Sequence, residues 1–133
     1  MQASRCRRTK MPKKQQHEAC EQEKLFRWAA YMESRFPALG LLHHIPNGGS
    51  RNVLEAANLK RQGVKAGVPD VCLPVPSSGR HGLYIEMKYG RNKPTEKQRA
   101  WLNALKNQGY AVAVCYTWEQ AQELICKYLH INL

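Results

Sequence analysis

The sequence predicts a single α/β domain in which helices flank a mixed β-sheet. Three observations lead to this prediction. A chain of 133 residues is long enough to bury one core. Helical spacing alternates with short apolar runs in the order α-β-α-β-β-α-β-α. The two central strands are joined by a short turn, and the last strand follows a helix, so antiparallel and parallel pairing are both expected.

Each expected element has its own pattern of side chains and its own end signals. The first helix rests on residues that recur at spacings of three and four, from Glu18 through Leu25 to Met32. Pro37 and Gly40 are expected to end it. The predicted elements are a helix over 17–36, a strand over 41–45, a helix over 51–62, strands over 71–75 and 83–88, a helix over 95–108, a strand over 111–116 and a helix over 118–129.

Turn-forming residues separate the middle elements. Pro-Asn-Gly-Gly at 46–49 ends the first strand, and Gly63 closes the second helix. The loop 65–69 then leads to Asp70 at the start of the second strand. The connection 76–82 is rich in Gly and Ser and predicts a hairpin.

The last three elements are bounded as clearly. Thr95 and Gln98 have the spacing of a capping box, in which a threonine and a glutamine close the start of a helix. Gly109 stops that helix. The apolar run 111–116 is typical of a buried strand, and the final helix follows it.

The chain is strongly basic, with a formal net charge of +11 and an isoelectric point of about 9.7. Residues 1–15 are polar and patternless and predict a disordered basic arm, which leaves 16–133 as the domain. The domain without the arm is still basic, which favours a polyanionic partner such as nucleic acid.

The number of cysteines and the hydropathy of the chain indicate the redox environment and the compartment in which the protein is expected. The number of cysteines is odd, 5, and no two form a C-x-x-C pair. We therefore expect no disulfide framework, no structural zinc site and a reducing, cytoplasmic location. Cys72 and Cys115 lie in apolar runs and are expected to be buried. No apolar stretch is long enough to span a bilayer, so no membrane partner is expected.

The chemistry is expected at Asp70, Glu86 and Lys88. Asp70 is the only aspartate, and Glu86 and Lys88 lie two apart in an apolar run, so a strand would point both to one face. Two carboxylates and an ammonium group at the end of a small sheet can bind a divalent cation and activate water. The structural alternative is a cross-strand salt bridge among the three.

These residues and their neighbours resemble the VRR-NUC domain, the virus-type replication-repair nuclease, of the PD-(D/E)XK nuclease superfamily. The resemblance implies a restriction-endonuclease-like core and extends over about 17–129. The stretches that carry it are 45–49, 63–70 and 82–88, followed by Gln98, Trp101, Leu102, Leu105 and Gly109-Tyr110.

The resemblance implies a role for each residue of the site. Asp70 and Glu86 would be the main ligands of Mg²⁺ or Mn²⁺, with the backbone carbonyl of Met87 as a further ligand. Lys88 would position the water or the phosphate, or act as a base.

Nucleases of this type often add an acid from the first helix. The preferred candidate is Glu21, with Glu18 close behind, and a solvated acid near a helix start is the alternative for either. Gln98 is expected either near the metal site or in the capping box with Thr95, and the sequence leaves both open.

The implied function is that of a metal-dependent, structure-specific DNA endonuclease. Resolution of four-way (Holliday) junctions by a homodimer is expected, in a phage or bacterial replication and repair role, since larger members with extra domains cut flaps. The alternatives are a flap or other structure-specific nuclease and a catalytically inactive DNA-binding module. His43, His44 and His81 are expected to be packing or surface residues. The candidate DNA contacts are Asn47, Arg51, Lys60, Arg61, Lys65, Arg91, Lys93 and Lys97.

Overall fold

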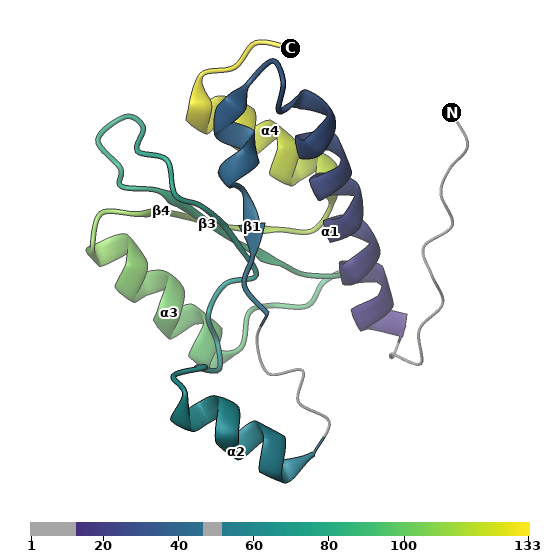
Figure 1. The fold of residues 1–133 in the computed structure, drawn as a ribbon, viewed down its shortest axis with the longest axis vertical. Coiled ribbons are helices and arrows are strands. Elements are labelled where there is room, and N and C mark those ends of the chain that lie inside the picture. Colours follow the sequence, from purple (N-terminus) through teal and green to yellow (C-terminus); the bar gives the residue numbers. More distant parts are fainter. Residues whose placement is uncertain (1–12, 47–51) are drawn as a thin grey trace.

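A computed structural model describes residues 13–46 and 52–133 (Figure 1). The elements in chain order are α1 (Lys13–Met32), the 3₁₀ helix η1 (Pro37–Leu41), β1 (His43–His44), α2 (Val53–Arg61), β2 (Val71–Leu73), β3 (Leu83–Met87), α3 (Glu96–Asn107), β4 (Ala111–Cys115) and α4 (Trp118–Leu129).

Four strands form one mixed sheet in the order β1-β2-β3-β4. The pairs β1·β2 and β2·β3 are antiparallel, while β3·β4 is parallel. The parallel pair is joined through α3, because parallel neighbours need a crossover connection. The predicted α/β fold with a mixed sheet flanked by helices is confirmed.

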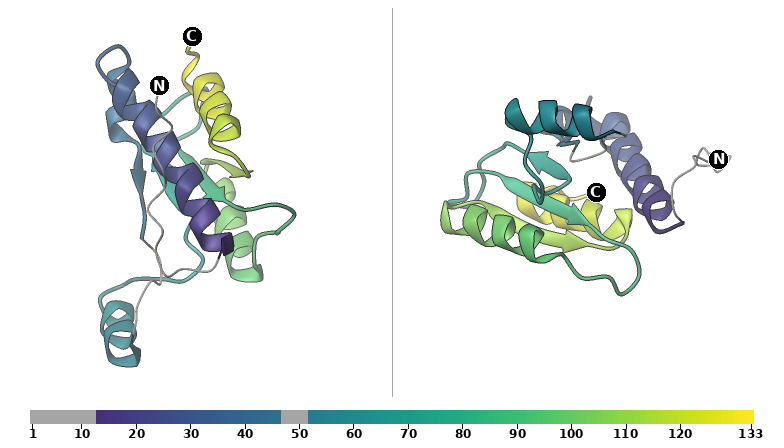
Figure 2. Two further views of the ribbon diagram at one scale, coloured as in Figure 1. Left: turned by 90° about the vertical axis from the view of Figure 1, so that its right-hand side faces the viewer. Right: turned by 90° about the horizontal axis from the view of Figure 1, so that it is seen from below.

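The core lies between the sheet and the pair α1 and α4. Alternate residues of β3, Leu83 and Ile85, are buried with Leu25 of α1 and Ile125 of α4 in one apolar cluster. Helices α1 and α4 pack against each other, and α3 lies on the opposite side of the sheet from α4 (Figures 1 and 2). Both sides of β3 are therefore covered, which keeps water away from its end.

The first helix begins earlier and ends earlier than predicted. Residues 13–15, which the sequence assigned to the arm, belong to α1, since lysine and glutamine favour helix without showing an apolar stripe. The helix ends at Met32, and Pro37 opens the separate turn η1. The remainder of the predicted arm, residues 1–12, lies outside the described residues.

The loop before β2 packs closely on α3. Gly67 has φ +91°, and a Cβ there would come within 2.9 Å of the Lys97 carbonyl and 3.0 Å of the Trp101 ring. Only glycine tolerates both this backbone conformation and this approach. The contact holds the loop beside the start of α3 and so fixes where β2 begins.

The cysteines agree with the sequence in part. Cys72 and Cys115 are buried free thiols, as predicted, and Cys126 is a third. Cys20, in contrast, is disulfide-bonded, which departs from the expectation of no disulfide framework. No helix in 13–46 or 52–133 combines the length and the apolar character needed to cross a membrane.

Candidate active site

The start of β2 and the end of β3 bring the predicted carboxylates together. Val71 pairs with Ile85, so Asp70, which precedes β2, lies opposite Glu86. Asp70 Oδ2 accepts a hydrogen bond from the Met87 N–H at 2.9 Å. Antiparallel pairing thus joins two acids that are sixteen positions apart in the chain.

Lys88 completes this group of side chains just beyond β3. Its backbone N–H donates to the Cys115 carbonyl at 2.9 Å, which continues the pairing with β4. Its side chain is only 7% exposed, and Nζ lies 3.6 Å from Glu86 Oε1. A buried ammonium group needs such a partner, because an isolated charge is costly to desolvate.

Glu86 is the most perturbed acid of the group. It is 2% exposed, and its Oε2 has no hydrogen-bond partner among the described residues. Burial, followed by the negative charge of Asp70, raises the pKa of Glu86 to about 8, although Lys88 opposes the shift. Burial also raises the pKa of Asp70, against the stabilising hydrogen bond from Met87.

The two acids of α1 face different partners. Glu21 Oε2 accepts the Trp118 N–H at 2.8 Å at the start of α4, and its Oε1 lies 3.5 Å from Lys24 Nζ. Glu18 is held near Lys88 and Asp70, and burial raises its pKa while Lys88 lowers it. Glu18 Oε1 is buried without a hydrogen-bond partner in the described part of the chain. The charges of Lys88 and Asp70 therefore act on Glu18, whereas the preferred Glu21 is engaged at the start of α4.

Of the two roles expected for Gln98, the structure shows the capping box with Thr95. Its Oε1 accepts the Thr95 N–H at 2.8 Å, and its own N–H donates to Thr95 Oγ1 at 3.3 Å. This is a complete capping box at the start of α3. The amide oxygen of Gln98 is thus engaged at the helix terminus and not with the carboxylates.

His44, which the sequence analysis expected to be a packing or surface residue, is a neighbour of the site. Its Nδ1 lies 2.7 Å from the Asp70 carbonyl oxygen, which can only accept, so Nδ1 carries the proton. The Ile45 N–H donates to the same carbonyl at 2.7 Å. The one hint in the sequence was the position of a histidine at the end of an expected strand.

The described basic candidates lie on exposed segments. Lys65 is in the loop that packs on α3, and Lys97 is in the first turn of that helix. Arg91 and Lys93 are exposed in the loop that follows Lys88. Lys60 and Arg61 end α2, where Arg61 also hydrogen-bonds Asn58. Asn47 and Arg51 lie outside the described residues.

The acids suit a hard divalent cation, although in residues 13–46 and 52–133 no three His, Cys, Asp or Glu side chains converge on one point. Two acids, Asp70 and Glu86, supply carboxylate oxygens, and the buried Oε2 of Glu86 has no protein partner there. Magnesium and manganese prefer such oxygen ligands, with waters filling the remaining positions.

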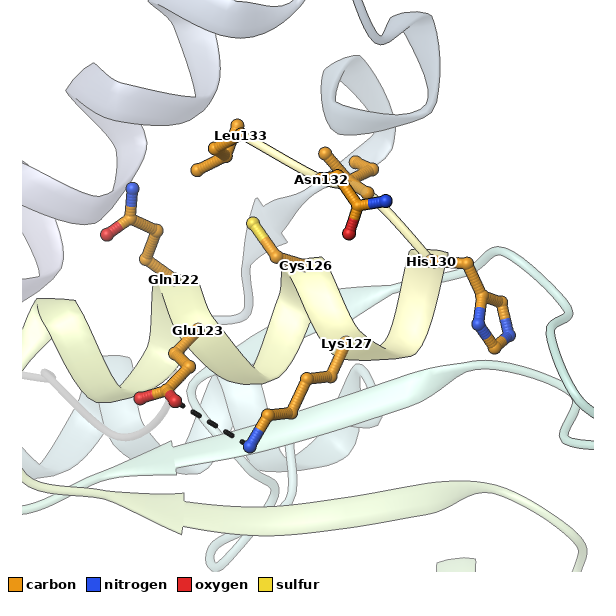
Figure 3. A pocket seen from close by; sticks show the side chains of 8 residues that line it. Gln122, Glu123, Cys126, Lys127, His130, Asn132 and Leu133 are labelled. Atoms are coloured by element: carbon orange, nitrogen blue, oxygen red, sulfur yellow. Dashed lines mark ion pairs between the residues drawn. The ribbon is translucent and has the colours of Figure 1, made fainter.

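A hollow of about 690 Å³ lies away from these acids, at the C-terminal end of α4 (Figure 3). It is lined by Cys126, His130 and Leu133 among others, and by the ion pair of Glu123 and Lys127, 3.6 Å apart. Asp70, Glu86 and Lys88 are not among its lining residues. The hollow is therefore separate from the candidate site at the sheet end.

The fold, with acids and a lysine at the end of its two central strands, is that of a PD-(D/E)XK nuclease. Nuclease domains of this type generally use divalent metals. A nuclease domain implies DNA as the substrate. The family model of the VRR-NUC domain matches residues 7–118, and the chain belongs to this family.

One solved structure, described as a "VRR_NUC domain protein", has a TM-score of 0.73 to this chain and 29% sequence identity. The match covers 87% of this chain and 90% of that one. No curated protein matches the chain.

Proposed function

We propose that the protein is a Mg²⁺- or Mn²⁺-dependent endodeoxyribonuclease that acts on branched DNA and resolves four-way junctions as a homodimer. The observation that carries the nuclease chemistry is the pairing of the half-buried Asp70 with the buried Glu86 and Lys88. A salt bridge alone would not explain the site, because Glu86 Oε2 and Glu18 Oε1 stay buried and unpartnered among the described residues.

Asp70 and Glu86 would hold the cation, together with the backbone carbonyl of Met87. The bound cation would lower the pKa of a water ligand and offset negative charge on the phosphate. Glu18 would bind through water or act as a further ligand. Because Lys88 Nζ is held 3.6 Å from Glu86, it is placed to orient the attacking water or a phosphate oxygen.

The branched substrate and the dimer are supported by symmetry and charge. One such centre cuts one strand, whereas a four-way junction needs two symmetric cuts, and a two-fold dimer supplies two centres. The exposed cations Lys65, Arg91, Lys93 and Lys97 lie in segments that adjoin the site residues in sequence and would meet backbone phosphates.

The test is cleavage of labelled substrates of matched sequence: a four-way junction, a 5′ flap, a linear duplex and a single strand. Each is incubated with Mg²⁺, Mn²⁺ or EDTA. We expect paired nicks in the junction that disappear with EDTA and fall roughly a hundred-fold or more in Asp70→Asn. Glu23→Gln, which changes an exposed acid of α1, is the matched control and should cleave as the parent does.

Other outcomes would contradict either the resolvase assignment alone or the nuclease activity as a whole. Preferred cleavage of the flap, or a protein that sediments as a monomer with and without junction DNA, would remove the resolvase assignment and keep the nuclease. Tight DNA binding without cleavage in any metal would instead indicate a catalytically inactive binding module.

A further inference from the structure

Two exposed aromatic rings lie beside the carboxylates and have no part in the chemistry described so far. The rings of His17 and Tyr89 stack at a tilt, with their centroids 4.3 Å apart and their planes at 43°. His17 directly precedes Glu18, and Tyr89 directly follows Lys88. The pair therefore joins α1 to the chain just beyond β3, next in sequence to Glu18 and Lys88.

The backbone that carries Tyr89 is held in place by hydrogen bonds. The Asn92 N–H donates to the Tyr89 carbonyl at 3.1 Å, and the Tyr116 hydroxyl donates to the Asn92 carbonyl at 3.0 Å. The Tyr89 N–H also bonds the Glu18 carboxylate. None of these contacts uses the Tyr89 ring, which is 39% exposed.

The charges around the pair are suited to nucleic acid. Lys14 lies close enough to act on the Glu18 carboxylate, and Arg91 and Lys93 are exposed in the loop that Tyr89 begins. Aromatic faces combined with cations are the usual means of binding unpaired nucleotides, because the bases stack on the rings while the cations follow the phosphates. A base inside a duplex is already stacked and offers no free face.

We propose that His17 and Tyr89 form a stacking platform that receives an unpaired base of the DNA beside the scissile phosphate. The inference rests on the proposed nuclease function and narrows its substrate to DNA with an unpaired or unstacked nucleotide next to the cut. Such nucleotides occur at branch points and forks.

Base stacking can be measured apart from cleavage. The fluorescent base 2-aminopurine is placed at an unpaired position of a fork and, for comparison, within a linear duplex. Binding is followed with Asp70→Asn protein, so that the DNA stays intact. We expect this protein to quench the emission of the fork, since 2-aminopurine loses fluorescence when it stacks on an aromatic ring.

Changes of the Tyr89 ring supply the decisive comparison. Adding Tyr89→Ala to Asp70→Asn should restore the emission and weaken fork binding by about five-fold or more, while duplex binding changes little. Tyr89→Trp should retain the quenching. Tyr31→Ala removes a ring of α1 that is 80% exposed and should change nothing.

Unchanged quenching in Tyr89→Ala, or an equal loss of fork and duplex binding, would overturn the platform. If Tyr89→Ala lowers the melting temperature, Tyr89→Leu and His17→Ala take its place, because each removes one ring face. Failure of the parent to cleave any DNA would count against the nuclease proposal alone, since the quenching experiment needs no cleavage.

Discussion

The buried carboxyl group of Glu86 can either hold a proton or bind a divalent cation. Its pKa is raised to about 8, chiefly by burial, so without a cation the side chain keeps its proton to a higher pH than an ordinary glutamate does. A divalent cation favours the carboxylate and must displace the proton. Metal binding and pH are therefore linked at this residue.

The free energy of unfolding should report this linkage. Since the folded-state pKa of Glu86 lies above its ordinary value of 4.5, its contribution to stability is fully present below pH 4.5 and is lost as the pH rises through about 8. In EDTA, the melting temperature should fall by at least about 3 °C from pH 5 to pH 8. Glu86→Gln cannot titrate and should reduce this slope.

The control for this effect is Glu23→Gln, whose exposed side chain should leave the pH slope unchanged. Identical slopes in the parent and in Glu86→Gln would contradict the raised pKa. Addition of Mg²⁺ should restore stability to the parent at pH 8 and have little effect on Glu86→Gln, because a neutral amide is a poorer ligand.

Glu18 and Glu21 offer a second comparison at the residue scale. Glu18→Ala should lower metal-dependent cleavage by roughly ten- to a hundred-fold, the usual cost of losing a group that supports a metal site. Its stability should change little, because the loss of the Tyr89 hydrogen bond is offset by the removal of a carboxylate that burial disfavours. Thermal melts and cleavage rates measured on the same preparations would separate the two effects.

Glu21→Ala should have the opposite profile. It removes the acceptor of the Trp118 N–H at 2.8 Å and should cost about 1–2 kcal/mol of stability with cleavage retained. A loss of cleavage in Glu21→Ala without a loss of stability would show that Glu21, and not Glu18, is the acid that α1 adds to the metal site.

At the scale of elements, periodicity and capping predicted which elements exist, and their ends best where a cap marks them. The helices over 95–108 and 118–129 are observed at Glu96–Asn107 and Trp118–Leu129. The strand over 41–45 shrinks to two residues, because only these pair with β2 at the sheet edge. The length of such a strand depends on how many of its residues pair with the neighbouring strand, and the spacing of residues along the sequence does not predict this.

The capping box of α3 gives a prediction at this scale. Gln98→Ala should lower stability by about 0.5–2 kcal/mol, as the loss of a helix cap does, and Thr95→Ala should have a similar effect. Both should leave metal-dependent cleavage near the parental rate. A ten-fold loss of cleavage in Gln98→Ala alone, at unchanged melting temperature, would place Gln98 in the active site.

At the scale of the whole molecule, charge governs how DNA is held. Exposed cations lie in three separate segments, namely the loop before β2, the loop after β3 and the start of α3. Each phosphate contact releases counterions, so the logarithm of the affinity falls with the logarithm of the salt concentration.

The salt dependence of binding should identify the cations that contact DNA. Lys65→Ala and Lys97→Ala should each weaken binding to every substrate and lower the salt slope by about 0.9. Lys106→Ala, an exposed cation in the last turn of α3, is the control and should keep the parental slope. An unchanged slope in all three variants would place the DNA on another face.

The sequence by itself determined the family, the order of the elements and the three residues at the strand ends. These features are local: a strand points Glu86 and Lys88 to one side, and Pro69-Asp70 opens the strand before it. The burial of Glu86 and Lys88 follows from the same apolar run.

Only the tertiary structure decided which neighbours these residues have. Glu18 and Glu21 share one face of α1, so helical spacing cannot separate them. Their partners depend on where α1 crosses the sheet: Glu21 meets the start of α4, and Glu18 lies near Lys88 and Asp70. The contacts of His44 with Asp70 and of His17 with Tyr89 likewise join distant parts of the chain, and such contacts arise from packing, which no spacing along the sequence encodes.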